Sequence, residues 1–540
     1  MKSVSNDAIL VGSYSLESLT TGMYENPLHC LREYVQNAYD SIRSARSNGL
    51  LDETEGLVSI AIGGSAARPV LTITDDGEGI IADKTVGTLV SIGASQKRST
   101  GNAGFRGIGR LAGTAYCTTL RFSTTARGED TETVVEFDCG RMRGYLRPGA
   151  EVLEAKEVMR LCATFETRAA AVEKHHMQVE MIGLVGIGLE FVEIETLTPY
   201  LRQVCPTDYS DRFGFAQRIR TFCESVGSPL GAVEVETRFK RERNQILKGY
   251  DNASPTASGS SKIHDLELIS SPDLGWHAWI GKSSFAGEIT DDTVAGVRFR
   301  LKNIQVGGSE IIEDIAAELT TGRTEGRLQR YAVGEIFISN PAVVPNARRD
   351  GFEDAPAWRD IRNDIKARVA RRVITLVRAA STARKTLKTL QADISSLARQ
   401  AADVHRNPEA IDRLVAIADK IIVNLGADKL NSAHPNEVGE LLATVKGIRD
   451  SLIEARATKP PKPAAEEEAP AEEPEAGKDA GPEDSPDEEE SGHDESASEA
   501  EEEWPANELL AALIEVLKGE LGDSEAQRLI LLARENLAGS

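Results

Sequence analysis

The chain has 540 residues, and single hydrophobic cores stop growing at about 250–300 residues, so we expect several domains. The net charge of −23 arises largely from one acidic segment and therefore says little about what the folded part binds. The six cysteines show no zinc or disulfide spacing, and no run of about 18 apolar residues occurs. These features exclude a secreted disulfide framework and a membrane-spanning protein, and they predict a soluble, cytoplasmic one.

The first 200 residues predict an α+β domain. Apolar and small residues at helical spacing indicate a helix over residues 28–46. Alternating apolar residues between glycine-rich loops predict strands at residues 57–62, 70–74, 119–124, 133–137 and 190–197. This mixture indicates helices packed on a mixed, largely antiparallel sheet.

Two further folded regions are expected. Residues 201–358 form a second, middle-domain-like α+β region, with a surface loop at 252–261. Its strands are predicted at residues 233–239, 276–280, 296–301 and 333–339. Residues 359–456 read as helices, with breaks near residues 407–408 and 432–435.

The chain changes character at residue 457. Residues 459–503 hold 19 acidic and 3 basic side chains, and they contain no Val, Ile, Leu, Phe, Tyr, Trp or Thr. Such a segment cannot bury enough apolar surface to offset the entropy of ordering, so residues 457–503 should be a disordered linker. Residues 504–540 then predict a C-terminal helical module, with amphipathic helices at 507–518 and 524–538.

Glu33, Asn37 and Asp40 share one face of the first predicted helix, because they are spaced by four and three residues. A carboxylate there can hold an attacking water, and an amide oxygen close to it can ligate Mg²⁺. Taken alone, the triplet is also compatible with a solvated polar helix face.

A second block begins where a predicted strand ends at Asp75. Gly77 and Gly79 follow and would let the backbone come close to a flat ligand. An acidic group at such a strand end can accept a hydrogen bond from the amino group of adenine. By itself, this D-G-x-G sequence also fits an ordinary turn.

A third block has glycines at 104, 107 and 109, which would expose backbone N–H groups to phosphates. A helix beginning near Arg110 would add the partial positive charge of its N-terminus. Lys97 could approach a terminal phosphate. A dinucleotide-binding interpretation fails, because no strand–glycine–helix unit opens the domain.

In this order the three blocks resemble the Bergerat-type ATP-binding fold of the GHKL superfamily. That superfamily includes DNA gyrase, the ninety-kilodalton heat-shock chaperones, sensor histidine kinases and mismatch-repair ATPases. The resemblance implies Glu33 as general base, Asn37 as Mg²⁺ ligand and Asp75 as adenine reader. It further implies a pocket lined by Asp40, Gly77, Gly79, Ser95, Lys97, Gly104, Arg106, Gly107, Ile108 and Gly109.

Two positions depart from the superfamily pattern. Asp76 follows the adenine-reading residue where Asn is usual. The threonine that many members place on a late strand is not evident, and Phe191 occupies the expected position. We therefore do not assign that contact.

Glu33 separates the branches of the superfamily, because histidine kinases generally carry Asn there. The closest resemblance is to the heat-shock chaperones, whose middle-domain loop brings an Asn and, three residues later, an Arg to the nucleotide. Here these are Asn346 and Arg349, with Arg348 as the nearest rival. A guanidinium in this place would neutralise developing phosphate charge. A basic surface loop is the simpler alternative.

Residues 359–388 carry ten basic side chains against two acidic ones. This stripe is typical of a solvated helix face or of an anion-binding surface for nucleic acid. A third hypothesis is that the acidic linker folds back onto it and blocks it.

The main functional expectation is a Mg²⁺-dependent ATPase that works as a chaperone-type dimer clamp. Its C-terminal helices would provide dimerisation or bind a protein client or partner. The alternative is a DNA-linked ATPase clamp of the mismatch-repair, topoisomerase or MORC kind, in a defence or repair system. A non-enzymatic scaffold locked by nucleotide is the third candidate.

Overall fold

The computed structural model describes residues 11–19, 26–93, 107, 109–257, 259–319, 324–404, 407–427, 430 and 435–457. These residues form helices together with two mixed, largely antiparallel sheets, which confirms the predicted α+β class. Within the same residues, no helix is both long and apolar enough to cross a membrane.

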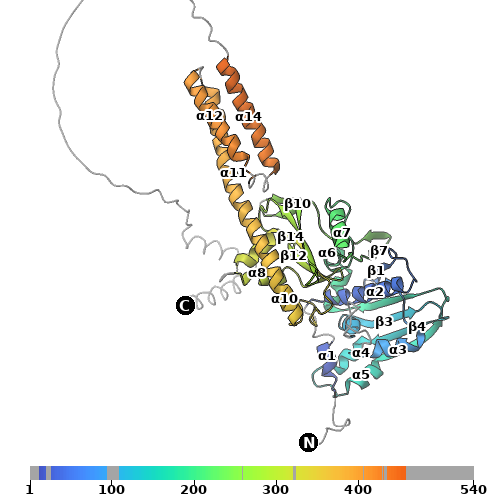
Figure 1. The fold of residues 1–540 in the computed structure, drawn as a ribbon. Coiled ribbons are helices and arrows are strands. Elements are labelled where there is room, and N and C mark those ends of the chain that lie inside the picture. The colour runs from blue at the N-terminus through green and yellow to red at the C-terminus, as the bar shows by residue number, and fades with distance from the viewer. Residues whose placement is uncertain are drawn as a thin grey trace, which may run out of the picture. The chain divides into compact units, whose positions relative to one another are not determined.

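The first sheet has eight strands in the order β5-β4-β3-β6-β2-β1-β7-β8 (Figure 1). Its strands are β1 (Leu57–Ser65), β2 (Arg68–Asp75), β3 (Cys117–Thr125), β4 (Thr131–Asp138), β5 (Ala163–Ala169), β6 (His176–Leu184), β7 (Glu234–Phe239) and β8 (Glu242–Gln245). All neighbours are antiparallel except β1 and β7, which are parallel. The four strands predicted between residues 57 and 137 are thus confirmed.

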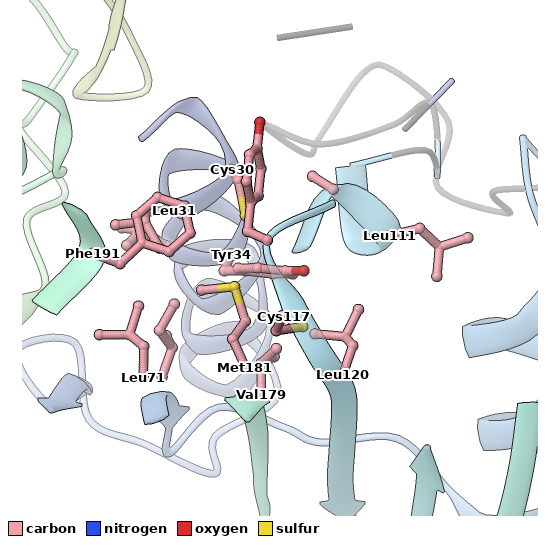
Figure 2. Close-up of a cluster of buried hydrophobic side chains, with 14 of the residues drawn as sticks. Cys30, Leu31, Tyr34, Leu71, Leu111, Cys117, Leu120, Val179, Met181 and Phe191 are labelled. Carbon is pink, nitrogen blue, oxygen red and sulfur yellow. The ribbon is translucent and has the colours of Figure 1, made fainter. Parts of the chain in front are cut away.

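Helices cover one face of this sheet. They are α1 (Tyr14–Leu19), α2 (His29–Ser47), α3 (Ala82–Val90), the 3₁₀ helix η2 (Gly109–Ala115), α4 (Cys139–Tyr145), α5 (Ala155–Cys162), the 3₁₀ helix η3 (Gly186–Val192) and α6 (Ile194–Val204). The helix predicted at 28–46 is α2, and its apolar stripe packs on the strands (Figure 2). Tyr34 lies among the side chains of Cys117, Leu120 and Met181. Removing this stripe from water provides most of the hydrophobic stabilisation of the layer.

Two expectations for the first region are corrected. Residues 190–197, predicted as a strand, lie in η3 and α6, because Leu197 and Leu201 form a helical apolar face with Phe191. The expected boundary at residue 200 falls inside α6, and β7 and β8 lie beyond it although they pair with the first sheet.

The second sheet has six strands in the order β13-β12-β14-β11-β10-β9. They are β9 (Ala253–Thr256), β10 (Gly259–Ser271), β11 (Trp276–Ser283), β12 (Gly296–Leu301), β13 (Ile304–Val306) and β14 (Val333–Ile338). The predicted strands at 276–280, 296–301 and 333–339 are confirmed. The predicted surface loop at 252–261 is wrong, since β9 pairs with the start of β10 there.

Both faces of the second sheet are covered. Trp276 and Ile280 of β11 pack toward α10 (Pro356–Ile365) and α11 (Arg371–Asp403), while Trp279 packs with Phe213 and Ile219 on the other face. This alternation follows from the two-residue period of a strand. The covering helices are α7 (Ala216–Ser225), α8 (Glu310–Ala317), α9 (Thr324–Leu328), the 3₁₀ turn η4 (Gln329–Tyr331) and α10 (Pro356–Ile365).

The hairpin of β12 and β13 links the two regions. Lys302 and Asn303 form its two-residue turn, and both have positive φ, of 51° and 63°. Positive φ at both central residues is the signature of a type I′ turn, whose twist matches that of the strands. Ile304, the next residue, is buried in the core of the first region rather than of the second.

A helical region follows. It consists of a π-helical turn η5 (Lys366–Ala370), α11 (Arg371–Asp403), α12 (Pro408–Leu425) and α14 (Pro435–Ala457), and the last three lie side by side (Figure 1). The predicted break at 407–408 is confirmed, because the Asn407 side chain caps α12 by accepting from the amides of Glu409 and Ala410. The predicted acidic linker and C-terminal helices lie outside the described residues.

Candidate active site

Helix α2 places the first three candidate residues. Glu33 and Asp40 are buried, with 8% and 3% of their surface exposed, and Asn37 is half-buried between them. A solvated polar helix face does not fit two buried carboxylates, because burying an ionised group without partners is costly. The triplet therefore faces other groups of the protein or a ligand.

The turn after β2 holds Asp75. This carboxylate is buried and accepts a hydrogen bond from the amide of Gly77 at 3.0 Å. A Cβ at Gly77 would collide with Ser41 of α2, and one at Gly79 (φ +68°) would collide with the backbone oxygen of Thr125. The two glycines were expected to let the backbone approach a flat ligand. In the structure they instead let the turn pack closely against α2 at Gly77 and against the end of β3 at Gly79.

Two residues that the sequence analysis missed hold this turn. Nδ1 of His175 lies 2.8 Å from the carbonyl oxygen of Gly77, which requires the Nδ1–H tautomer as donor. The hydroxyl of Thr124 accepts from the amide of Ile80 at 3.0 Å and donates to the carbonyl of His176 at 2.7 Å. These contacts depend on strand pairing, so no local spacing in the sequence could indicate them.

The position expected for a late-strand threonine is also corrected. Phe191 lies in η3 and is fully buried in the core. Of the two strands beside β2, the one later in the chain is β6, in which Met177 is paired with Asp75. Met177, rather than Phe191, is therefore the strand neighbour of the candidate adenine-reading carboxylate.

The glycine-rich block is described only in part. Gly107 has φ of +69°, and Gly109 lies so close to Glu33 that a Cβ there would collide with the carboxylate. Tyr34 fixes this approach, because its hydroxyl donates to the carbonyl of Arg110 and accepts from the amide of Gly113, both at 3.0 Å. The other predicted members, Ser95, Lys97, Gly104, Arg106 and Ile108, lie outside the described residues.

Arg349 and Glu33 meet although 315 residues separate them in the chain. Nε of Arg349 lies 2.7 Å from Oε1 of Glu33, and both side chains are buried. The N–H does not point along this line, so the contact is an ion pair without a well-aligned hydrogen bond. Arg348, the rival candidate, is exposed. The structure thus places Arg349, and not Arg348, against the candidate base.

Arg32 of α2 holds the same loop. Its guanidinium donates to the backbone oxygens of Arg348 at 2.9 Å and of Arg349 at 3.3 Å. Asn346, the other residue assigned from the loop, donates through its side-chain amide to Asp350 at 2.6 Å. The sequence analysis missed Arg32, because a contact to backbone oxygens leaves no pattern in residue types.

Lys302 adds a second cation to the outer side of α2. Its ammonium is buried without a hydrogen-bond partner among the described residues. Burial lowers the pKa of Lys302 to about 8, although the nearby carboxylate of Asp40 raises it. Burying an ammonium in this way is costly. The position of Lys302 is therefore set by the rigid hairpin turn and not by interactions of its ammonium group.

The basic stripe at 359–388 is largely neutralised within the protein. Seven of its ten side chains contact carboxylates or backbone oxygens: Arg359, Arg362, Lys366, Arg368, Arg372, Arg378 and Arg384. Arg362 and Lys366, for example, share Glu318. The stripe therefore offers much less charge to nucleic acid, or to the acidic linker, than its composition indicates.

The donor set at the site fits a nucleotide-bound magnesium ion. Mg²⁺ keeps several waters and usually takes one or two protein oxygens together with substrate phosphates. The carboxamide of Asn37 makes no hydrogen bond to the described residues and could supply one such oxygen. Among those residues, no cluster of three or more His, Cys, Asp and Glu side chains could form an all-protein metal site.

Comparisons with known proteins add no evidence to the assignment of this site. None of the protein-family models scanned matches it, and a search of curated proteins finds no similar sequence.

Proposed function

We propose that the chain is a Mg²⁺-dependent ATPase of the Bergerat-fold type. One observation carries this proposal: the two side chains assigned to the hydrolytic step, Glu33 and Arg349, lie in contact although different regions supply them. A chance surface loop has no reason to bury its arginine against a buried carboxylate. The resemblance of the three sequence blocks to GHKL ATPases supports the same conclusion.

In the proposed reaction Glu33 accepts the proton of the attacking water. Arg349 neutralises this carboxylate while the site is empty, and a terminal phosphate competes for the guanidinium when ATP binds. Transfer of Arg349 from Glu33 to the phosphate then frees the base in the same step that stabilises the phosphate. A magnesium ion held through Asn37 would neutralise further phosphate charge.

This exchange of partners by Arg349 would couple nucleotide binding to a change in conformation. Because Arg349 belongs to the second region, its transfer pulls that region toward the bound phosphate. The proposal therefore extends to a conformational machine like the heat-shock chaperones, with dimer clamping and a protein client or partner. The DNA-linked alternative loses its main support, because most of the basic stripe is already paired.

Steady-state hydrolysis and binding of ATP test the proposal. Glu33→Ala should lower kcat by about 10²–10⁴-fold, the usual worth of a positioned general base, and should retain ATP binding. Glu224→Ala removes an exposed glutamate on α7 and is the matched control. Failure of the wild-type chain to bind or hydrolyse ATP would refute the proposal. Turnover that duplex DNA stimulates, with a steep salt dependence, would instead favour the DNA clamp.

A further inference from the structure

Arg32 stands one residue before the candidate base. Successive residues of a helix point about 100° apart, so Glu33 and Arg32 can face two different neighbours. Glu33 faces Gly109 and Arg349, whereas Arg32 reaches the backbone of the loop that carries Arg349. Arg32 is 3% exposed, so this long cation is committed to an interior contact.

The loop itself is a closed turn within the second region. Its ends are bridged between Pro345 and Phe352, and the amide of Asn346 donates to the carbonyl of Gly351 at 3.0 Å. The amide of Gly307 donates to the carbonyl of Arg349 at 2.9 Å. These bonds fix the shape of the loop, but they are all internal to the second region. They do not set its distance from Glu33.

Arg349 sits at the tip in a strained conformation. Its φ of +57° lies in the left-handed region, which costs a non-glycine residue free energy. Such a conformation persists only where its surroundings hold it. The carbonyl of this strained residue is one of the two oxygens that Arg32 binds.

We propose that Arg32 is a positioning residue, which docks the backbone of the 345–352 loop onto α2 so that the Arg349 side chain reaches the reacting phosphate. The guanidinium suits this role because its two terminal nitrogens bind two successive carbonyl oxygens in a fixed fork. Lysine has three donors on a compact, rotatable head and lacks this fixed planar fork, so it holds two successive carbonyls less firmly. The inference rests on the proposed ATPase function and adds a residue that acts through Arg349.

Other contacts keep the regions together when Arg32 is removed. Arg300 donates to the carbonyl of Gln203 at 2.6 Å, and Asn303 donates to the carbonyl of Thr207 at 3.1 Å. Both tie the β12–β13 hairpin to the chain that leaves α6. Loss of Arg32 should therefore release the loop without separating the regions or unfolding the chain.

A double-mutant cycle on the full chain tests the proposal. Arg32→Ala should lower kcat about 10–10²-fold with little change in KM for ATP, and it should lower kcat no further when Arg349→Ala is already present. Arg32→Lys should recover only part of the loss. Arg43→Ala removes an exposed arginine from the same helix and should leave turnover unchanged. Unchanged turnover in Arg32→Ala, or losses that multiply in the double variant, would overturn the proposal.

Amide hydrogen exchange supplies a measurement independent of activity. In the nucleotide-free chain, Arg32→Ala should raise exchange at residues 345–352 at least about tenfold, while exchange in β11 and β14 stays unchanged. Equal exchange in the loop would show that Arg32 does not dock it. If the wild type hydrolyses no ATP, the proposed function fails, and this exchange result still decides whether the docking contact exists.

Discussion

Two buried glutamates, Glu33 and Glu335, each meet an arginine inside this protein, but their surroundings differ. Glu335 of β14 is fully buried and accepts from Lys248 at 3.0 Å and from Arg300 at 2.6 Å. Tyr209 also donates to it. Every part of this network is supplied by the fold, so the carboxylate has no remaining need for another partner.

The charges of this network stabilise one another. Burial alone would raise the pKa of Glu335, but Arg300 and Lys248 outweigh it and hold the pKa at about 2. Burial and the charge of Arg300 lower the pKa of Lys248 to about 7, against the opposing effect of Glu335. Such a satisfied network fixes a core in one arrangement.

The hydrogen-bonding capacity of the Glu33 carboxylate is satisfied less completely than that of Glu335. Its contact with Arg349 lacks a well-aligned hydrogen bond, and Arg349 is strained. Buried polar atoms without partners among the described residues lie on the same helix, at Nε of Arg32 and at both amide atoms of Gln36. An incomplete arrangement can exchange partners at little cost. Completeness of the hydrogen bonding, rather than burial, therefore distinguishes the structural carboxylate of Glu335 from the carboxylate of Glu33, which can exchange partners.

Neutralising the two glutamates one at a time should give the largest difference between them. Glu335→Gln leaves Lys248 and Arg300 buried without a counter-charge, and removing one partner of a buried pair costs about 3–5 kcal/mol. Glu33→Gln removes one buried ion pair that lacks a well-aligned hydrogen bond, so it should cost less, about 1–2 kcal/mol. Urea denaturation of both variants measures the difference. Equal destabilisation would show that Glu33 is as structural as Glu335.

Lys302 allows the corresponding test on a buried cation. Lys302→Met removes a buried donor without a partner, which should stabilise the chain by about 1–3 kcal/mol at pH 7. The folded-state pKa is lowered to about 8 from 10.5, with Asp40 and Arg43 as the charged neighbours. The folded chain therefore loses this proton above pH 8 while the unfolded chain keeps it, so the wild type gains stability between pH 8 and 10.5.

Denaturation of Lys302→Met and wild type across this pH range provides the measurement. The advantage of the variant should shrink as pH rises from 8 to 10.5. Lys446→Met, on α14, is the control and should show no such trend. A variant that is less stable than wild type at pH 7 would reveal a partner for the ammonium.

An exposed pair should show the smallest effect. Arg359 and Asp354 form a two-pronged contact at the surface, with distances of 2.5 Å. Solvent screens such pairs, so Arg359→Ala should leave the free energy of unfolding almost unchanged. Thermal or urea denaturation checks this expectation. A larger loss would mean that the paired basic stripe supports the fold and is more than a neutralised surface.

The features that could be predicted from the sequence are those that the local spacing of residues controls, such as which side chains share a helix face. Glu33, Asn37 and Asp40 were placed on one helix because a helix repeats every 3.6 residues, and α2 has the expected bounds within one residue. The strand prediction at residues 190–197 is wrong, because their alternating pattern also fits a short 3₁₀ helix followed by an α-helix. Periodicity does not distinguish these over so few residues.

What the sequence could not predict depends on contacts between distant segments. The parallel pairing of β7 with β1 joins strands about 170 residues apart, and no turn signal indicates it. Arg32 binds backbone oxygens, which every residue type possesses. The sequence motif indicated Arg349 as a phosphate-binding residue, but it did not indicate the contact of Arg349 with Glu33 in the nucleotide-free chain. In each case the partner was set by tertiary structure.

The packing of Ile304 in the core of the first region has a practical consequence for the preparation of fragments of this protein. A fragment that ends before the β12–β13 hairpin would lack a side chain that fills the interior of the first sheet layer. Its interior would be left with a hole and an uncovered apolar wall, both of which favour aggregation. The first region should therefore be purified together with the β12–β13 hairpin, and it should not be treated as a module that folds alone.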